Sequence, residues 1–143
     1  PPLLGGVANE AYVNPETLQE IGEPVNGALS TGYALDRTSE AGQNVPQRFQ
    51  ETYGEPMDAN VGMAYAATQV IIEAIEQAGT TDAEVINETL QEIEVQDHIM
   101  AMPAITFGPD GENENALAPL HQIQELVPHV VRPETYSDRD AQL

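Results

Sequence analysis

The chain has 143 residues, of which 24 are Asp or Glu and 4 are Arg, with no Lys, so its formal net charge is -20. This length corresponds to one domain with a single hydrophobic core. The shortage of basic residues argues against a surface that displaces phosphate counterions, and hence against nucleic-acid binding, and also against attraction to anionic lipids.

The acidity of the chain indicates the kind of solvent to which the protein is adapted, and it does not indicate the ligand. Hydrophobic residues make up 41% of the sequence, and they fall in periodic runs separated by helix caps, which disfavours the disorder that a high net charge otherwise suggests. A folded protein with this charge repels itself at low ionic strength, and salt screens that repulsion. We therefore expect a halophilic protein with a carboxylate-rich, hydrated surface.

Three further classes of feature do not occur in these residues. No apolar run reaches the 18 residues that a membrane span requires, no signal-peptide pattern is visible, and no Cys is available for disulfides or thiolate metal sites. The chain opens on Pro1, without a Met, directly before an apolar run. This opening suggests part of a longer protein.

The first third of the chain predicts a strand, a helix and a second strand. Residues 3–8 are apolar and contain two glycines, as at the end of a parallel strand. Residues 14–22 predict a helix that Asn14 caps and Gly22 ends. Residues 27–35 contain the Leu, Thr and Tyr residues typical of a strand.

An amphipathic helix is predicted over residues 44–54. Val45, Phe49 and Tyr53 recur at four-residue spacing and therefore share one face, and Pro46 lies near the expected start of the helix.

Residues 61–78 predict a longer helix that is apolar around most of its circumference. The apolar side is formed by Ala64, Ala67, Ile71, Ala74, Ile75 and Ala78, and Val70 and Ile72 widen it. The polar side is a narrow stripe of Gln69, Glu73, Glu76 and Gln77. Such a helix is expected to be buried between a sheet and another helix.

A second helix is predicted directly after Gly79. Thr81 and Glu84 have the spacing of a capping box, and Ile86, Leu90 and Ile93 share one face of the helix that follows.

The pattern changes to strands after residue 100. Residues 103–115 predict a strand followed by a Pro-Asp-Gly turn. Residues 120–133 predict two short strands with a break near Pro128. The polar tail from residue 134 is expected to fray.

Catalytic and metal-binding patterns are weak throughout the sequence. His98, His121 and His129 do not have the spacing of metal ligands, and no Ser lies in a nucleophile motif. Residues 110–115 alternate acidic and amide side chains, which hints at Ca²⁺, but the Gly is second rather than sixth, so an acidic hairpin turn is favoured. No enzyme, cofactor or metal site is expected.

The order of several short motifs resembles the C-terminal part of type I periplasmic binding proteins, especially the branched-chain amino-acid (Leu/Ile/Val) binding proteins of ABC transporters. The motifs are Tyr53, Gly54 and Pro56; Tyr65 to Ala67; Ala78, Gly79 and Asp82; Phe107, Asp110 and Gly111; and Gln122, Gln124 and Pro133. Upstream, residues 3–33 are similar to the family's strand, helix and strand before a hinge. The resemblance covers nearly the whole chain.

This resemblance implies an α/β fold of two three-layer lobes that trap a small ligand by hinge closure. Residues 1–33 would end the second lobe, residues 34–117 would return to the first lobe, and residues 118–143 would cross back. The implied protein is an extracytoplasmic, non-enzymatic subunit that works with ABC permease subunits. A missing N-terminal portion would carry most strands and a lipid anchor, and the isolated fragment would self-associate or adopt a rearranged packing.

The resemblance also suggests where the ligand binds. In amino-acid-binding members an acidic residue after the first strand pairs with the ligand's ammonium group; the positions here are Val7 and Ala8, which cannot form that pair, and Asn9 or Glu10 can substitute. A second contact region precedes the Tyr-Ala-Ala helix, where a helix N-terminus can face an anionic group. The candidate ligand-binding residues are Val7, Ala8, Asn9, Glu10, Asn60, Val61 and Gly62.

An equally good interpretation is that these seven positions are ordinary loop residues that bind no ligand. The ligand is open between a branched-chain amino acid, another amino acid, an amide and another small polar solute. Two other functions also remain open: a sensor or receptor ectodomain with the same fold, and an acidic interaction module without a small ligand.

Overall fold

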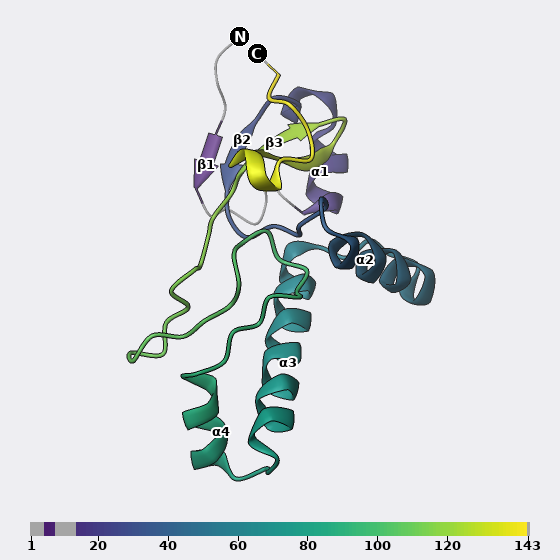
Figure 1. Cartoon of the computed structure of the whole chain (residues 1–143). Helices are drawn as coiled ribbons and strands as arrows, with labels where there is room; N and C mark the ends of the chain where they lie inside the picture. Colours follow the sequence, from purple (N-terminus) through teal and green to yellow (C-terminus); the bar gives the residue numbers. More distant parts are fainter. Residues whose placement is uncertain (1–4, 8–13, 143) are drawn as a thin grey trace.

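The structure, a computed structural model, describes residues 5–7 and 14–142. Its sheet has the order β1-β2-β3-β4. β1 (Gly5–Val7) pairs parallel with β2 (Leu29–Thr31), β2 pairs antiparallel with β3 (Leu120–Gln124), and β3 forms a hairpin with β4 (Val127–Arg132). The sheet lies in the upper part of Figure 1. Segments far apart in sequence therefore build one sheet.

Helix α1 (Pro15–Ile21) is formed as the sequence predicts. The Asn14 side chain accepts a hydrogen bond from Thr17 N at 3.0 Å, and Gly22 ends the helix at φ 74°. A 3₁₀ turn, η2 (Glu23–Val25), leads from α1 toward β2. The helix packs on the sheet through a small core of Leu18, Val25, Ala28 and Ile123. Burying each large side chain in this core contributes about 1.5–3 kcal/mol.

Helix α2 (Glu40–Tyr53) starts earlier than predicted. Ser39 Oγ accepts from Gly42 N at 3.0 Å and caps the helix five residues before the expected start at Asn44. Pro46 therefore lies inside the helix, so its placement near the start was wrong. The expected face is confirmed in part. Val45 and Phe49 pack against the main core, a cluster of buried apolar residues formed mainly within 66–74 and 93–105, but Tyr53 is 67% exposed.

Helices α3 (Ala59–Ala78) and α4 (Ala83–Leu90) form the lower part of Figure 1. Gly79 ends α3 in the left-handed conformation, as predicted. The cap of α4 is Asp82 rather than the predicted Thr81, since Asp82 Oδ1 accepts from Glu84 N at 3.0 Å and from Val85 N at 3.3 Å. Ile86 and Leu90 of the predicted face pack against the main core. Ile93, which was predicted on the same helix, lies beyond its end at Leu90 but is buried in that core.

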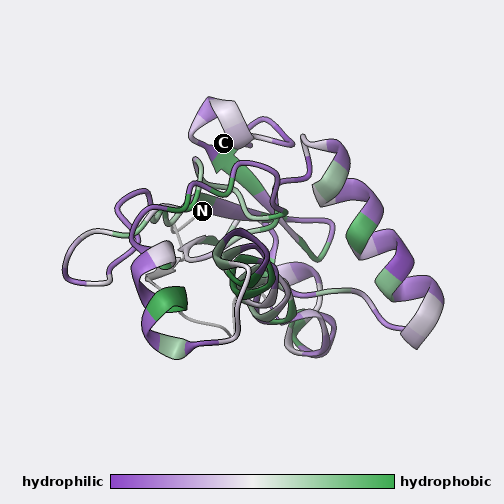
Figure 2. Cartoon of the chain, turned by 60° about the horizontal axis from the view of Figure 1, so that its bottom comes forward, coloured by the Kyte–Doolittle hydropathy of each residue, from purple (hydrophilic) through white to green (hydrophobic). Residues whose placement is uncertain are grey.

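The face of α3 that is buried differs from the predicted one. The buried residues form a single stripe at four-residue spacing: Gly62, Ala66, Val70 and Ala74. Ile71 and Ile72, expected inside, are 45% and 50% exposed. Figure 2 shows hydrophobic residues on the central helix α3 and mostly hydrophilic ones on α2. The expectation of burial around most of α3 was therefore wrong for the described residues, because among them only one side of the helix has packing partners.

Residues 91–119 follow an irregular path along α3. The strand predicted from residue 103 occurs only as isolated bridges, Val95 with Ile105 and Phe107 with Asn113. The predicted turn is confirmed, with Gly111 at φ 81° and Asp110 Oδ1 accepting from Glu112 N at 3.1 Å. This segment supplies the main core with Ile93, Val95, Ile99, Met100, Met102 and Ile105.

The turn between β3 and β4 lies at residues 125–126, so the break expected near Pro128 was misplaced. Glu125 and Leu126 have φ values of 56° and 64°, a region that side-chain-bearing residues seldom occupy. Leu126 N donates to Asn26 Oδ1 at 3.0 Å, and its side chain packs on the α1 core. Tertiary contacts thus hold a turn that local preference disfavours.

The tail after β4 is ordered, so the prediction that it frays was wrong. It forms a 3₁₀ turn, η3 (Glu134–Tyr136), and then hydrogen-bonds to β3 and β4. Within the described ranges, no helix has both the length and the hydropathy required to cross a membrane.

Candidate functional site

A cavity of about 250 Å³ lies where the sheet meets the start of α3. One wall comes from α1 and from the β3–β4 hairpin, and the opposite wall comes from the segment that leaves β2 and from the approach to α3. Arg37 and Asp58 both line it, so one cationic and one anionic group face the same space, beside apolar groups such as Leu35 and Val130. This combination suits a small zwitterionic solute.

The first turn of α3 contains three of the predicted ligand residues, and the structure gives them different surroundings. Asn60 is exposed, and Val61 lines a different cavity between α2 and α3. Gly62 is buried, and a Cβ there would overlap the side chain of Leu35. Their role in binding stays a prediction.

The amide groups at this helix terminus already have a local acceptor. Asp58 Oδ1 accepts from Val61 N at 2.9 Å, so a carboxylate of the chain itself caps α3. The sequence reasoning missed Asp58, although an Asp before a helical run is a recognisable N-cap signal. It also missed Arg37 and Tyr33, for which no local pattern existed.

The other predicted ligand residues follow β1. Val7 is the last residue of β1 and pairs with Thr31 at the end of β2, so the carboxyl ends of both parallel strands lie at one edge of the sheet. From that edge the chain continues through Tyr33 and Leu35 to the cavity. Ala8, Asn9 and Glu10 lie outside the described residues.

His121 is the most strongly perturbed group at the cavity. It is 3% exposed, and burial, together with the charge of Arg37, lowers its pKa to about 4, although the charge of Asp138 acts in the opposite direction. Its Nδ1 and Ser30 Oγ, at paired positions of β3 and β2, both lack a hydrogen-bond partner within the described part of the chain. His121 is therefore neutral at pH 7, and the charged groups that line the cavity are Arg37 and Asp58.

We predict that His121 makes folding sensitive to mild acid. In the unfolded chain His121 has its ordinary pKa of 6.5, but in the folded chain its pKa is about 4. Stability is therefore fully present above pH 6.5 and falls as the pH drops to about 4. The total loss is about 3 kcal/mol. Urea unfolding in molar salt, compared between pH 7.5 and 4.5, should show this loss of stability in the native chain. In His121→Gln the loss should be smaller by about 2 kcal/mol or more.

The two proteins carry the same carboxyl groups, so the difference between their pH slopes isolates His121. Equal slopes would contradict the assignment.

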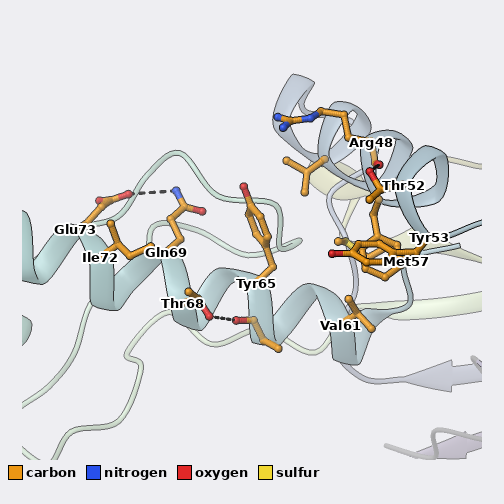
Figure 3. Close-up of a pocket in the computed structure, with 13 residues that line it drawn as sticks. Arg48, Thr52, Tyr53, Met57, Val61, Tyr65, Thr68, Gln69, Ile72 and Glu73 are labelled. Carbon is orange, nitrogen blue, oxygen red and sulfur yellow. Dashed lines mark hydrogen bonds between the residues drawn. The ribbon is translucent and has the colours of Figure 1, made fainter. Parts of the chain in front are cut away.

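The larger cavity, about 640 Å³, lies between α2 and α3. The Phe49 and Tyr53 rings contact each other at a tilted angle, with centroids 4.6 Å apart, and Tyr65 of α3 lines the same cavity (Figure 3). Gln69 donates to Glu73 at 3.2 Å along one rim. Over the described ranges, no group of three or more His, Asp or Glu residues is arranged to hold a metal ion.

Comparisons with known proteins place this geometry in a family. A family model described as periplasmic binding protein matches residues 7–124. A leucine-binding protein from Thermotoga maritima is similar in structure, with a TM-score of 0.68, 22% identity, and coverage of 88% of this chain and 36% of that chain. A comparison with curated proteins returned no match.

Two further solved structures share the fold. A candidate branched-chain amino acid ABC transporter protein from Silicibacter pomeroyi has a TM-score of 0.73 at 15% identity, covering 92% of this chain and 38% of that chain. An ABC transporter substrate-binding protein from Desulfitobacterium hafniense, in complex with Leu, has a TM-score of 0.61 at 16% identity, covering 81% and 38%.

The chain thus spans between a third and two fifths of the length of these proteins. The predicted α/β fold, part of the type I periplasmic binding protein architecture, is confirmed. Because the family model matches residues 7–124 of 143, this chain belongs to the periplasmic binding protein family.

Proposed function

We propose that this chain is part of a non-enzymatic solute-binding protein of an ABC importer that captures a small amino acid by closure of two lobes. The observation that carries the proposal is the cavity between the sheet and the start of α3, in a member of this family. Arg37 matches a ligand carboxylate, Asp58 matches an ammonium group, and the apolar wall matches an aliphatic side chain. Two of the similar structures are named for leucine, which supports a branched-chain ligand.

We propose the same lobe division as the sequence suggested. Residues 1–33 and 118–143 would belong to one side, because β1, β2, β3 and β4 form one sheet. Residues 34–117 would belong to the other lobe, because α2, α3 and α4 have a separate core. The cavity lies between the two groups of elements, as a closing cleft requires.

The proposed ligand contacts combine both predicted regions with the residues beside them. On the sheet side they are Val7, at the end of β1, and Ala8, Asn9 and Glu10, which lie outside the described residues. Asn60 to Gly62 would approach from α3, next to Asp58, whose second carboxylate oxygen is not used in the cap.

Membership of the family implies an extracytoplasmic location. We further propose that the protein delivers its ligand to ABC permease subunits and is held at the cell surface by a lipid anchor outside these 143 residues.

The proposal is tested by a thermal-shift screen, in molar salt, of the protein expressed from its complete gene. A ligand that binds only the folded state stabilises it by about 2.7 kcal/mol at 100 times its Kd. We expect leucine, isoleucine or valine to raise the melting temperature, and the 143 residues alone to bind no better than about millimolar, because they form only part of the cleft.

The decisive control is an Arg37→Gln variant of the same protein, which should lose most of the shift. No shift with any amino acid or amide would overturn the proposed function.

A further inference from the structure

The C-terminal tail, residues 137–142, lies on a row of buried glutamines. Gln122 and Gln124 of β3 are each 3% exposed. Gln122 donates to Gln142 O at 2.8 Å and accepts from Gln142 N at 2.7 Å. Gln124 donates to Asp140 O at 2.8 Å and accepts from the Gln142 side chain at 3.0 Å.

These contacts are specific because both glutamine side chains use donor and acceptor groups together. A buried amide left without hydrogen-bond partners destabilises the folded state. Displacing the tail would leave Gln122 and Gln124 without their partners in the tail, so the tail has one defined position on β3.

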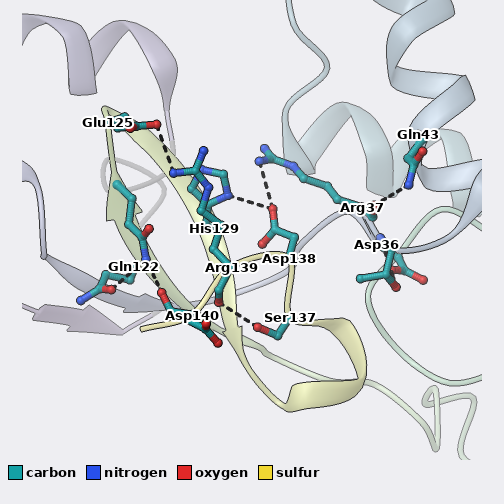
Figure 4. A network of polar contacts seen from close by, with 12 residues as sticks. Asp36, Arg37, Gln43, Gln122, Glu125, His129, Ser137, Asp138, Arg139 and Asp140 are labelled. Carbon is teal, nitrogen blue, oxygen red and sulfur yellow. Dashed lines mark hydrogen bonds and ion pairs between the residues drawn. The ribbon is translucent and has the colours of Figure 1, made fainter. Parts of the chain in front are cut away.

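Asp138 extends this attachment beyond β3, as Figure 4 shows. Its N donates to Val130 O of β4 at 3.1 Å. Its Oδ2 lies 2.8 Å from His129 Nδ1 and 3.4 Å from Arg37 NH1. Its Oδ1 is buried without a hydrogen-bond partner in the described part of the chain. The carboxylate is therefore held through Oδ2.

Arg37 belongs to the segment that joins the sheet to the helices. Directly before it, Leu35 bridges Met100, and Asp36 N donates to Ile99 O at 2.8 Å. The Arg37 carbonyl accepts from Gln43 of α2 at 2.9 Å. The contact between Arg37 and Asp138 thus ties the tail to the junction between the sheet and the helical core, across 101 residues of sequence.

We propose that residues 137–142 are a strap that fixes the sheet to the junction segment 34–38, with Asp138 as the positioning residue that joins them. The glutamines hold the strap on β3, and Asp138 transmits that attachment to Arg37. Arg139 adds a contact to the turn of the hairpin, since its NH1 lies 3.1 Å from Glu125 Oε2. Release of the strap therefore removes one of the contacts that hold the junction segment, and it leaves the core of α3 and α4 unchanged.

The test is hydrogen exchange measured by mass spectrometry, in molar salt, on the 143-residue chain and its Asp138→Asn variant. We expect exchange to rise about tenfold or more in residues 34–38 and 137–142, since the variant loses charge-assisted contacts. Exchange within α3 should not change.

Asp140→Asn is the matched control. It removes the same charge from the same strap, but the Asp140 side chain is exposed and its contact with Gln124 uses the backbone carbonyl. Hydrogen exchange in this variant should match that of the native chain.

A second variant, Arg37→Gln, keeps the strap on β3 and removes only the junction contact. It should raise exchange in residues 34–38 and leave the Gln142 amide protected. The proposal is overturned if Asp138→Asn exchanges like Asp140→Asn, or if its exchange rises equally throughout α3. It is also overturned if Arg37→Gln leaves residues 34–38 unchanged. These outcomes do not depend on ligand binding, so they stand apart from the proposed function.

Discussion

Replacing Gly42 with Ala is expected to lower the free energy of unfolding by about 1–3 kcal/mol, the cost of overpacking, although Ala is the better helix former by about 1 kcal/mol. Gly42 is the third residue of α2 and is buried. A Cβ at this position would overlap the carbonyl oxygen of Asp36 and approach Ser39 Oγ. That oxygen already accepts from Ser39 Oγ at 3.1 Å. The turn that starts α2 would therefore have to move.

The measurement is urea unfolding in molar salt, since urea leaves charge screening unchanged. Gln50→Ala is the matched control, because Gln50 is exposed on the same helix and exposed substitutions usually change stability by less than about 0.5 kcal/mol. A Gly42→Ala variant as stable as the control would contradict this prediction, because it would show that the turn at Asp36 moves without loss of stability.

Lowering the salt concentration from molar to millimolar is expected to lower the melting temperature strongly and to unfold part of the population. Of 24 acidic residues, the ion pairs among the described residues engage only Asp138 and Glu125. The remaining repulsion is screened over about 3 Å at 1 M salt but over about 30 Å at 0.01 M. Circular dichroism during thermal unfolding across a salt titration measures the effect.

A charge variant separates screening from other effects of salt. Glu84 and Glu88 are exposed like charges at i, i+4 spacing on α4, and such pairs repel on a helix. Glu84→Gln/Glu88→Gln should therefore melt at a higher temperature in low salt and show a shallower salt dependence. A native melting temperature that does not change with salt would refute the halophilic interpretation.

The sequence by itself determined the features that depend on neighbouring residues. Asn14 caps α1, and Gly22 and Gly79 end their helices, because each contact spans a few residues. The two strands around the hairpin also followed from local composition. The family resemblance followed from the order of such local motifs, and the family match confirms it.

Only the tertiary structure decided which surfaces are covered and which distant groups meet. The sequence shows that α3 is apolar on several sides, but the buried stripe from Gly62 to Ala74 depends on what lies opposite the helix. The polar tail is ordered because it hydrogen-bonds to Gln122 and Gln124 of β3. The residues of the tail itself do not predict these contacts. Arg37 and Asp58 line one cavity because whole elements pack together. Local sequence patterns do not predict such contacts between distant segments.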